Sequence, residues 1–148
     1  MEQISQQELE RRVCEEAAHR KQLPGMSSML SLDIVSVDAE RKEIVTSFNA
    51  ASWAENVNGT VHGGIITAAI DSTMGIMCRG MAYPRRGPTL NLNVNFLKSV
   101  RIGETMYTRV KLLRQGRNLM WMQAVSWTTD EEKLCASAEG TFYILDMK

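Results

Sequence analysis

Hydrophobic and polar residues alternate most regularly in the segment TLNLNVNF, which begins at Thr89. In an extended chain its apolar residues, from Leu90 to Phe96, fall on one face, and Thr89 and three asparagines fall on the other. A period of two is typical of a β-strand with one buried face. Residues 89–96 are therefore predicted to form a strand.

Five further apolar runs also predict strands. The first two lie on either side of a polar turn and are expected to pair as a hairpin. The other three follow residues 89–96 and are separated by polar turns, which predicts an antiparallel meander. The runs cover residues 30–37, 43–48, 104–114, 119–128 and 134–145.

Two helices are predicted, and their surroundings differ. Ser5 and Glu8 form a capping-box signature before an amphipathic run that extends to Gln22, and its thin apolar stripe is typical of a surface helix. The run from Val61 to Ala82 has apolar residues on every side, which is typical of a buried helix. This order of elements predicts an α+β fold in which a curved antiparallel sheet wraps around a central helix, with an extra N-terminal helix.

Length and composition bound the architecture. The chain has 148 residues, of which 44% are hydrophobic and 23% charged. Such a chain can bury about two thirds of its surface, enough for a globular core without disulfides or metal. We therefore expect a single domain over residues 1–148, in which residues 1–25 form a peripheral helix.

The charge balance and the cysteines exclude several classes of protein. Seventeen Lys and Arg side chains balance 17 Asp and Glu, so no overall field holds nucleic acid or an anionic membrane. The three cysteines lie far apart and only two histidines are present, which argues against a disulfide framework and a metal site. The first residues, MEQISQQELERR, lack the apolar stretch of an export signal. A cytoplasmic protein that binds neither nucleic acid nor membrane is expected.

Asp71 does not fit its apolar surroundings in the run at residues 63–78. An ionised carboxylate inside an apolar helix is costly unless something compensates it. One interpretation is a carboxylate that lines a cleft and acts as a catalytic base. The alternatives are a side chain that caps a turn or reaches solvent, or one that pairs with a cation such as Arg79.

The motif His62-Gly63-Gly64 stands where the central helix begins. Glycines there leave backbone N–H groups unshielded at the positive end of the helix dipole, where a carbonyl oxygen or an oxyanion could bind. The alternative is that the glycines only let the loop enter the core and that His62 is a hydrogen-bonded turn residue. Gly63 and Asp71 are about 12 Å apart along a helix. Both can act on one carbon only if a second copy of the chain brings its Gly63 to Asp71, as in a two-fold dimer.

The spacing of these residues resembles that of a known family. Asn56, the HGG motif and Asp71 are followed, eighteen residues after the aspartate, by Thr89 at the start of the TLNLNVNF strand. This pattern is similar to that of the hotdog-fold acyl-CoA thioesterases of the phenylacetate-pathway and thioesterase-superfamily-member-2 type, over residues 26–145. The resemblance implies a hotdog fold, hydrolysis of an acyl-CoA to free acid and coenzyme A, a homodimer or homotetramer, and no metal or redox cofactor.

The resemblance also implies a role for each of these residues. Asp71 would act as general base or nucleophile, and the Gly63 N–H of the partner subunit would polarise the thioester carbonyl. Asn56 would orient the water or the thioester, and His62 would lie beside the sulfur or position its loop. Thr89 would hold the nucleophilic water. Activation of water and direct attack through an anhydride both stay open.

Basic residues are concentrated in one part of the chain. From Arg85 to Arg117 there are eight Lys and Arg residues against the single acid Glu104. Coenzyme A carries a pyrophosphate and a 3′-phosphate, which such residues bind at strand ends and turns, although solvated strand faces would explain some of these charges. The resemblance selects the segments at 96–101 and 114–119 and leaves out two mid-strand cations. The expected substrate-binding residues are Gly64, Thr89, Phe96, Lys98, Arg101, Arg114, Gln115, Gly116 and Arg117.

Two other functions compete with this interpretation. A hotdog enoyl-CoA hydratase or dehydratase would use His62 as base and Asp71 as its acidic partner, although nine residues separate them on one element. A non-catalytic acyl-CoA-binding protein would bind without turnover. The acyl group stays open because the pattern does not define the depth of a pocket, and so does the choice of coenzyme A or acyl carrier protein as carrier.

Overall fold

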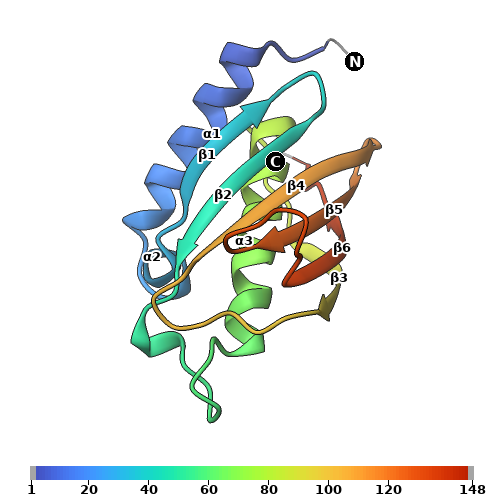
Figure 1. Ribbon diagram of the computed structural model, residues 1–148. Helices are drawn as coiled ribbons and strands as arrows, with labels where there is room; N and C mark the ends of the chain where they lie inside the picture. The colour runs from blue at the N-terminus through green and yellow to red at the C-terminus, as the bar shows by residue number, and fades with distance from the viewer. Residues whose placement is uncertain (1–2, 147–148) are drawn as a thin grey trace.

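The fold is built on a six-stranded antiparallel sheet with a long helix packed against it (Figure 1). The computed structural model describes residues 3–146. The strands follow the order β1-β2-β4-β5-β6-β3, which confirms the predicted α+β architecture. Their bounds are β1 (Asp33–Asp38), β2 (Glu43–Asn49), β3 (Thr89–Phe96), β4 (Thr105–Gln115), β5 (Leu119–Trp127) and β6 (Ala136–Tyr143).

Helix α3 (Gly63–Ala82) packs both against the sheet and against helix α1 (Gln6–Lys21). Its buried side chains occur on several sides of the helix, which confirms the burial that its sequence predicts. A short helix α2 (Met26–Leu30) and a 3₁₀ turn (Ser52–Ala54) complete the helical elements. Within residues 3–146, none of the helices combines the length and the hydropathy that a membrane crossing requires.

The first strand begins later than the sequence predicts. Leu30 ends α2, and Ser31 takes a left-handed conformation, with φ of 46°, at the end of that helix. β1 therefore starts at Asp33 and not at residue 30. Periodicity could not reveal α2, because a five-residue helix has too few positions to show a helical period.

β3 does not pair with β4, its neighbour in sequence. β4, β5 and β6 form the predicted meander, and β3 lies beyond β6, pairing with it from Thr89 opposite Phe142 to Phe96 opposite Ala136. β3 is thus an edge of the sheet, with no partner strand on its outer side among the described residues. Its outer backbone groups are open to pairing with a further strand.

A bulge near the start of β3 changes which side chains face α3. The pairing register with β6 shifts between Thr89 and Asn91. Strict alternation would place Thr89 on the face opposite Leu92, yet Leu92 packs on the core while Thr89 hydrogen-bonds to Asp71 of α3. The extra residue at the bulge accounts for this, because it turns Thr89 to the helix side.

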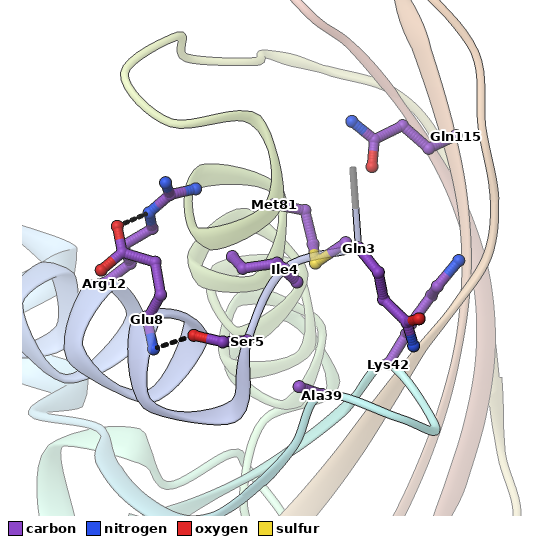
Figure 2. Close-up of a pocket in the computed structure, with 9 residues that line it drawn as sticks. All are labelled: Gln3, Ile4, Ser5, Glu8, Arg12, Ala39, Lys42, Met81 and Gln115. Carbon is purple, nitrogen blue, oxygen red and sulfur yellow. Dashed lines mark hydrogen bonds and ion pairs between the residues drawn. The ribbon is translucent and has the colours of Figure 1, made fainter. Parts of the chain in front are cut away.

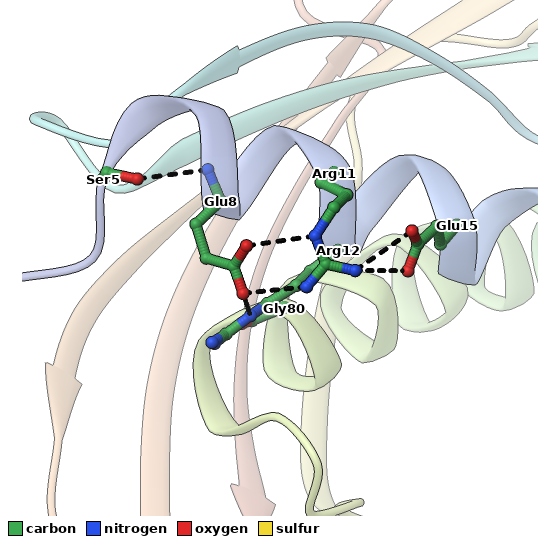
Figure 3. A network of polar contacts seen from close by, with 6 residues as sticks. All are labelled: Ser5, Glu8, Arg11, Arg12, Glu15 and Gly80. Atoms are coloured by element: carbon green, nitrogen blue, oxygen red, sulfur yellow. Dashed lines mark hydrogen bonds and ion pairs between the residues drawn. The ribbon is translucent and has the colours of Figure 1, made fainter.

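Helix α1 begins as predicted, with the Ser5 side chain accepting a hydrogen bond from the Glu8 N–H. The Glu8 carboxylate bonds to Arg11 and Arg12, and Arg11 also bonds to Glu15 (Figure 3). Hydrogen bonds from Arg11 and Arg12 lower the pKa of Glu8 to about 2. These pairs lie largely at the surface, where solvent screens them, so they contribute little to stability.

Helices α1 and α3 approach each other closely at Gly80. Arg12 Nη1 donates to the Gly80 carbonyl at 3.2 Å. A Cβ atom at Gly80 would lie 2.7 Å from Val13 Cγ1 and 3.1 Å from Leu9 Cδ1. The contact between the two helices therefore depends on the absence of a side chain at this position.

Gly80→Val is expected to lower the free energy of unfolding by about 1–3 kcal/mol, because the added side chain overpacks the contact between α1 and α3. Urea denaturation followed by circular dichroism measures this loss. Ala18→Val, at an exposed position of α1, is the matched control and should cost less than about 0.7 kcal/mol. If both variants had the same free energy of unfolding, the contact between α1 and α3 would accommodate the added side chain without loss of stability.

Candidate active site

α3 carries Asp71 near the middle of its length, and β3 places Thr89 beside it. The Thr89 hydroxyl donates a hydrogen bond of 2.6 Å to Asp71 Oδ1. Asp71 is half-buried and makes no ion pair within residues 3–146. Arg79, the cation that the sequence suggested for it, lies 3.7 Å from Glu16 instead. The carboxylate is therefore held by a hydroxyl and keeps lone pairs free for water or substrate.

The N-terminus of α3 presents a free backbone donor. His62 is the N-cap, and its Nδ1 accepts a hydrogen bond from the Gly64 N–H at 2.8 Å. Because the ring accepts through Nδ1, the neutral imidazole carries its proton on Nε2. The Gly63 N–H has no acceptor in the part of the chain that the structure describes. Gly63 thus offers its N–H to a ligand, whereas the Gly64 N–H is bound by His62.

An open pocket of about 360 Å³ lies beside Gly63. The Phe96 ring covers the glycine so closely that a Cβ atom there would lie 3.2 Å from it. Four of the residues predicted for the site line this pocket together: Asn56, Gly63, Phe96 and Lys98. The fold therefore places the N-terminus of α3 and the end of β3 side by side at this pocket.

The Asn56 side chain is engaged within its own loop. Its Oδ1 accepts hydrogen bonds from the N–H groups of Asn58 (2.9 Å) and Thr60 (3.1 Å), and its Nδ2 donates to Thr60 Oγ1 (3.0 Å). One amide hydrogen stays available to a ligand, so a role of Asn56 in orienting substrate stays a prediction. Thr60 also lines the pocket but is not among the predicted residues. A threonine four residues after an asparagine in a polar loop is the signal that could have found it.

Among the described residues, the basic side chains near the pocket and those in mid-strand differ in their ion pairs. Lys98 and Arg101 follow the end of β3, are exposed, and make no ion pair within residues 3–146. The two mid-strand cations, Arg109 and Lys111, lie 3.9 Å and 3.2 Å from the carboxylate of Glu43. Lys98 and Arg101 are therefore the better candidates to bind an anion at this end of the molecule.

The other predicted group, Arg114 with Gln115, Gly116 and Arg117, forms the end of β4 and its turn into β5. The Arg114 guanidinium lies 6.0 Å from the centre of the Trp121 ring. The Arg117 carbonyl accepts a hydrogen bond of 3.1 Å from an arginine in the segment just before β3. None of the four lines the pocket at the N-terminus of α3.

Gln115 lines a different hollow, of about 590 Å³, together with Gln3 and Met81 (Figure 2). The start of α1, the turn between β1 and β2 and the last turn of α3 form its other walls. Met81 lies ten residues after Asp71, about 15 Å along the helix. This hollow is therefore separate from the Asp71–Thr89 pair.

Within one chain the candidate groups form two separate halves. Asp71 and Thr89 lie at the start of β3, and Gly63 with Phe96 lies at its end. A carboxylate can take a proton from water or attack a carbonyl carbon, and a backbone N–H can stabilise charge on the carbonyl oxygen. Together the two halves supply what transfer of an acyl group to water needs.

Comparison with known proteins identifies the family. The sequence profile of the thioesterase superfamily matches residues 58–135, more than half of the chain. The mouse protein acyl-coenzyme A thioesterase 13 is 25% identical over 124 residues, which cover 82% of this chain and 86% of that protein. The Escherichia coli medium/long-chain acyl-CoA thioesterase YigI is 29% identical over 107 residues, covering 63% of this chain and 66% of that protein.

A solved structure agrees with the sequence comparison. A phenylacetic acid degradation-related protein from Ralstonia eutropha JMP134 superposes with a TM-score of 0.76 at 25% identity, over 89% of this chain and 98% of that one. The matched residues 58–135 contain the HGG motif, Asp71 and Thr89, which are the groups that the structure gathers around α3 and β3. The chain therefore belongs to the thioesterase superfamily and has the hotdog fold.

Proposed function

We propose that the protein is an acyl-CoA thioesterase, which hydrolyses an acyl-CoA to a free acid and coenzyme A. The observation that carries this function is the Asp71 carboxylate, held by Thr89 on a helix whose N-terminus offers the free Gly63 N–H. Family membership and the names of the mouse and E. coli relatives support it. The proposed chemistry uses a carboxylate, a backbone donor and water, and calls for no metal or redox cofactor.

In the proposed reaction the thioester carbonyl accepts a hydrogen bond from the Gly63 N–H, at the positive end of the α3 dipole. Asp71 either takes a proton from a water that attacks the carbonyl carbon, or attacks this carbon itself to form an anhydride that water then opens. The Thr89 hydroxyl occupies Oδ1 and leaves Oδ2 for this step. In both routes the C–S bond breaks, coenzyme A leaves as a thiolate that gains a proton, and the acid is released.

We also propose that each active site is shared by two copies of the chain, because its two halves lie about 12 Å apart along α3. The open edge of β3 supports this arrangement. If two such edges pair antiparallel about a two-fold axis, the Phe96 end of one strand lies beside the Thr89 end of the other. Gly63 of one copy then approaches Asp71 of the other, and two equal sites form in a dimer or in a tetramer of dimers.

The same pairing would gather positive charge for coenzyme A. Lys98 and Arg101 of one copy would lie near the segment before β3 of the other, where Arg85 contacts the carbonyl of Arg117. Such groups suit the pyrophosphate and the 3′-phosphate. Roles for the rest of the turn between β4 and β5 stay predictions, as does a cytoplasmic location.

An enoyl-CoA hydratase has less support from the geometry. His62 accepts the Gly64 N–H through Nδ1, which holds the ring at the helix terminus. Asp71 lies nine residues further on, about 13 Å along α3. The two side chains are therefore too far apart within one chain to work as an acid–base pair. In the proposed dimer the partner's ring would come closer, but its Nδ1 is occupied by the Gly64 N–H and its Nε2 carries the proton, so the ring has no free lone pair to act as a base.

Thiol release from a panel of short, medium, long and aryl acyl-CoAs tests the proposed function. Cys14 is exposed and contributes a background that a blank without substrate corrects. Burial raises the pKa of Cys78 to about 11, so this thiol reacts little near neutral pH. Release from at least one substrate is expected. Tight binding without release, or hydration of an enoyl-CoA in its place, would overturn the proposal.

Mixed dimers test the shared site. Asp71→Asn and Gly63→Pro should each keep about 1% of wild-type activity or less when alone. Random mixing should restore about a quarter of wild-type activity, because half of the dimers are mixed and each mixed dimer holds one intact site. Co-expression with two different tags allows the mixed dimers to be purified. Purified mixed dimers without activity would contradict a site built from Gly63 of one copy and Asp71 of the other.

A further inference from the structure

A trough of about 290 Å³ lies between α1, the second half of α3 and the segment before β3. Gly75 and Arg79, which line it, continue the helix row of Asp71 at a spacing of four residues, so they lie on the same face of α3. The opposite wall is the segment at 86–88, directly before Thr89 in sequence. The trough therefore begins about one helical turn from the Asp71–Thr89 pair.

Arginine side chains dominate the charge of this trough. Arg20 Nε donates to Glu16 Oε1 at 2.8 Å, and Arg79 Nε lies 3.7 Å from Glu16 Oε2. Glu16 is the acid of the lining and offsets one positive charge among Arg20, Arg79 and Arg86. The trough therefore keeps a net positive charge.

Several donors of these arginines are free. The Nη1 atoms of Arg20 and Arg79 donate to backbone carbonyls. Their Nη2 atoms, and the whole guanidinium of Arg86, have no acceptor in residues 3–146. A ligand in the trough would therefore find several charged N–H groups without a protein partner.

The position of Arg20 limits the length of an apolar ligand. A Cβ atom at Gly75 would lie 3.0 Å from Arg20 Nη2, so the guanidinium rests on the helix one turn after Asp71. Pro88 and Leu145 supply apolar surface to the lining. An alkyl chain extended along α3 from a thioester at Asp71 would reach the guanidinium after about 6 Å. The terminal methyl group of such a chain would remove water from the Arg20 guanidinium without offering it a hydrogen-bond acceptor, which is unfavourable.

We propose that this trough binds the acyl group and selects a short acyl group that ends in a carboxylate, such as the glutaryl group of glutaryl-CoA. The inference rests on the proposed thioesterase function and names its substrate class. The methylenes pack on Pro88 and Leu145, and the terminal carboxylate accepts hydrogen bonds from Arg86 and the free Nη2 atoms. Water adds its oxygen to the thioester carbon, the C–S bond breaks, and a dicarboxylic acid and coenzyme A are formed.

The ratio of kcat/KM for glutaryl-CoA to kcat/KM for pentanoyl-CoA tests this specificity, because the two acyl groups have equal carbon number and differ at the far end. The wild-type ratio is expected to exceed one. Arg86→Gln should lower it about ten-fold or more, because a charge-assisted hydrogen bond is lost. Arg41→Gln, an exposed arginine in the turn between β1 and β2, is the matched control and should leave the ratio unchanged.

Each other outcome identifies what fails. An equal loss of kcat/KM for both substrates in Arg86→Gln would mean that Arg86 binds an anion of coenzyme A. An unchanged kcat/KM for both substrates would mean that Arg86 contacts neither the acyl group nor coenzyme A. Either result overturns the inference. If the wild type hydrolyses pentanoyl-CoA as well as or better than glutaryl-CoA, the proposed substrate class is wrong but the thioesterase function stands. If no acyl-CoA releases a thiol, the proposed function itself is wrong.

Discussion

Asp71→Asn is expected to lower kcat for acyl-CoA hydrolysis by about 10² to 10⁴. Asparagine has nearly the same shape, and its side-chain oxygen can still accept the hydrogen bond from Thr89. The variant therefore keeps the contact between α3 and β3 and loses only the negative charge that takes a proton from water or attacks the thioester. KM should change little, because the carboxylate is not proposed to hold coenzyme A.

Initial rates of thiol release from the best substrate of the panel measure this effect, and urea denaturation verifies that the variant is folded. Asp38→Asn removes the same charge from an aspartate at the end of β1 and should keep full activity. An Asp71→Asn enzyme that retains most of its kcat would show that Asp71 is neither base nor nucleophile.

Gly63→Pro is expected to lower kcat by about 10² to 10³, because proline lacks the N–H that is proposed to stabilise charge on the carbonyl oxygen. Gly63 is the first residue of α3, a position that suits proline because its N–H has no acceptor within the helix. His62 has the extended conformation, with φ of −60° and ψ of 132°, that a residue before proline favours. The change should therefore remove the donor and leave the helix intact.

Gly63→Ala separates the lost donor from steric effects. Alanine keeps the N–H but adds a Cβ atom, 3.2 Å from the Phe96 ring. This ring is 55% exposed and has room to shift, so only a modest loss of activity is expected. If alanine and proline lower kcat equally, the loss comes from the contact with Phe96, and the Gly63 N–H is not the donor.

Much of the candidate site was visible in the sequence. The HGG motif at the start of an apolar run and Asp71 within it stand out locally, because glycine frees backbone donors and a carboxylate conflicts with apolar neighbours. In the structure the Gly63 N–H has no acceptor among the described residues, and Asp71 lies beside Thr89. Thr89 itself could be assigned only by resemblance, because simple alternation points it away from the helix.

Other parts of the site could not be predicted, because they depend on residues far apart in the chain. Asp71 and Arg79 lie on one helix, yet Arg79 pairs with Glu16 of α1. The arginines of the trough come from α1, α3 and the segment before β3, and no spacing in the sequence relates them. A local sequence pattern could suggest the basic residues, but it could not show which of them would have no acidic side chain as a partner.

The sequence by itself determined the class of fold, the central helix and the strands, because hydrophobic periodicity reports which face of each element is buried. It also marked Gly63 and Asp71 as chemically unusual. Only the tertiary structure decided that β3 leaves β4 and forms an edge beside β6, that a bulge turns Thr89 toward Asp71, and that the trough beside α3 gathers three arginines around one glutamate. These features arise from pairing between distant segments, and local periodicity does not specify which segments meet.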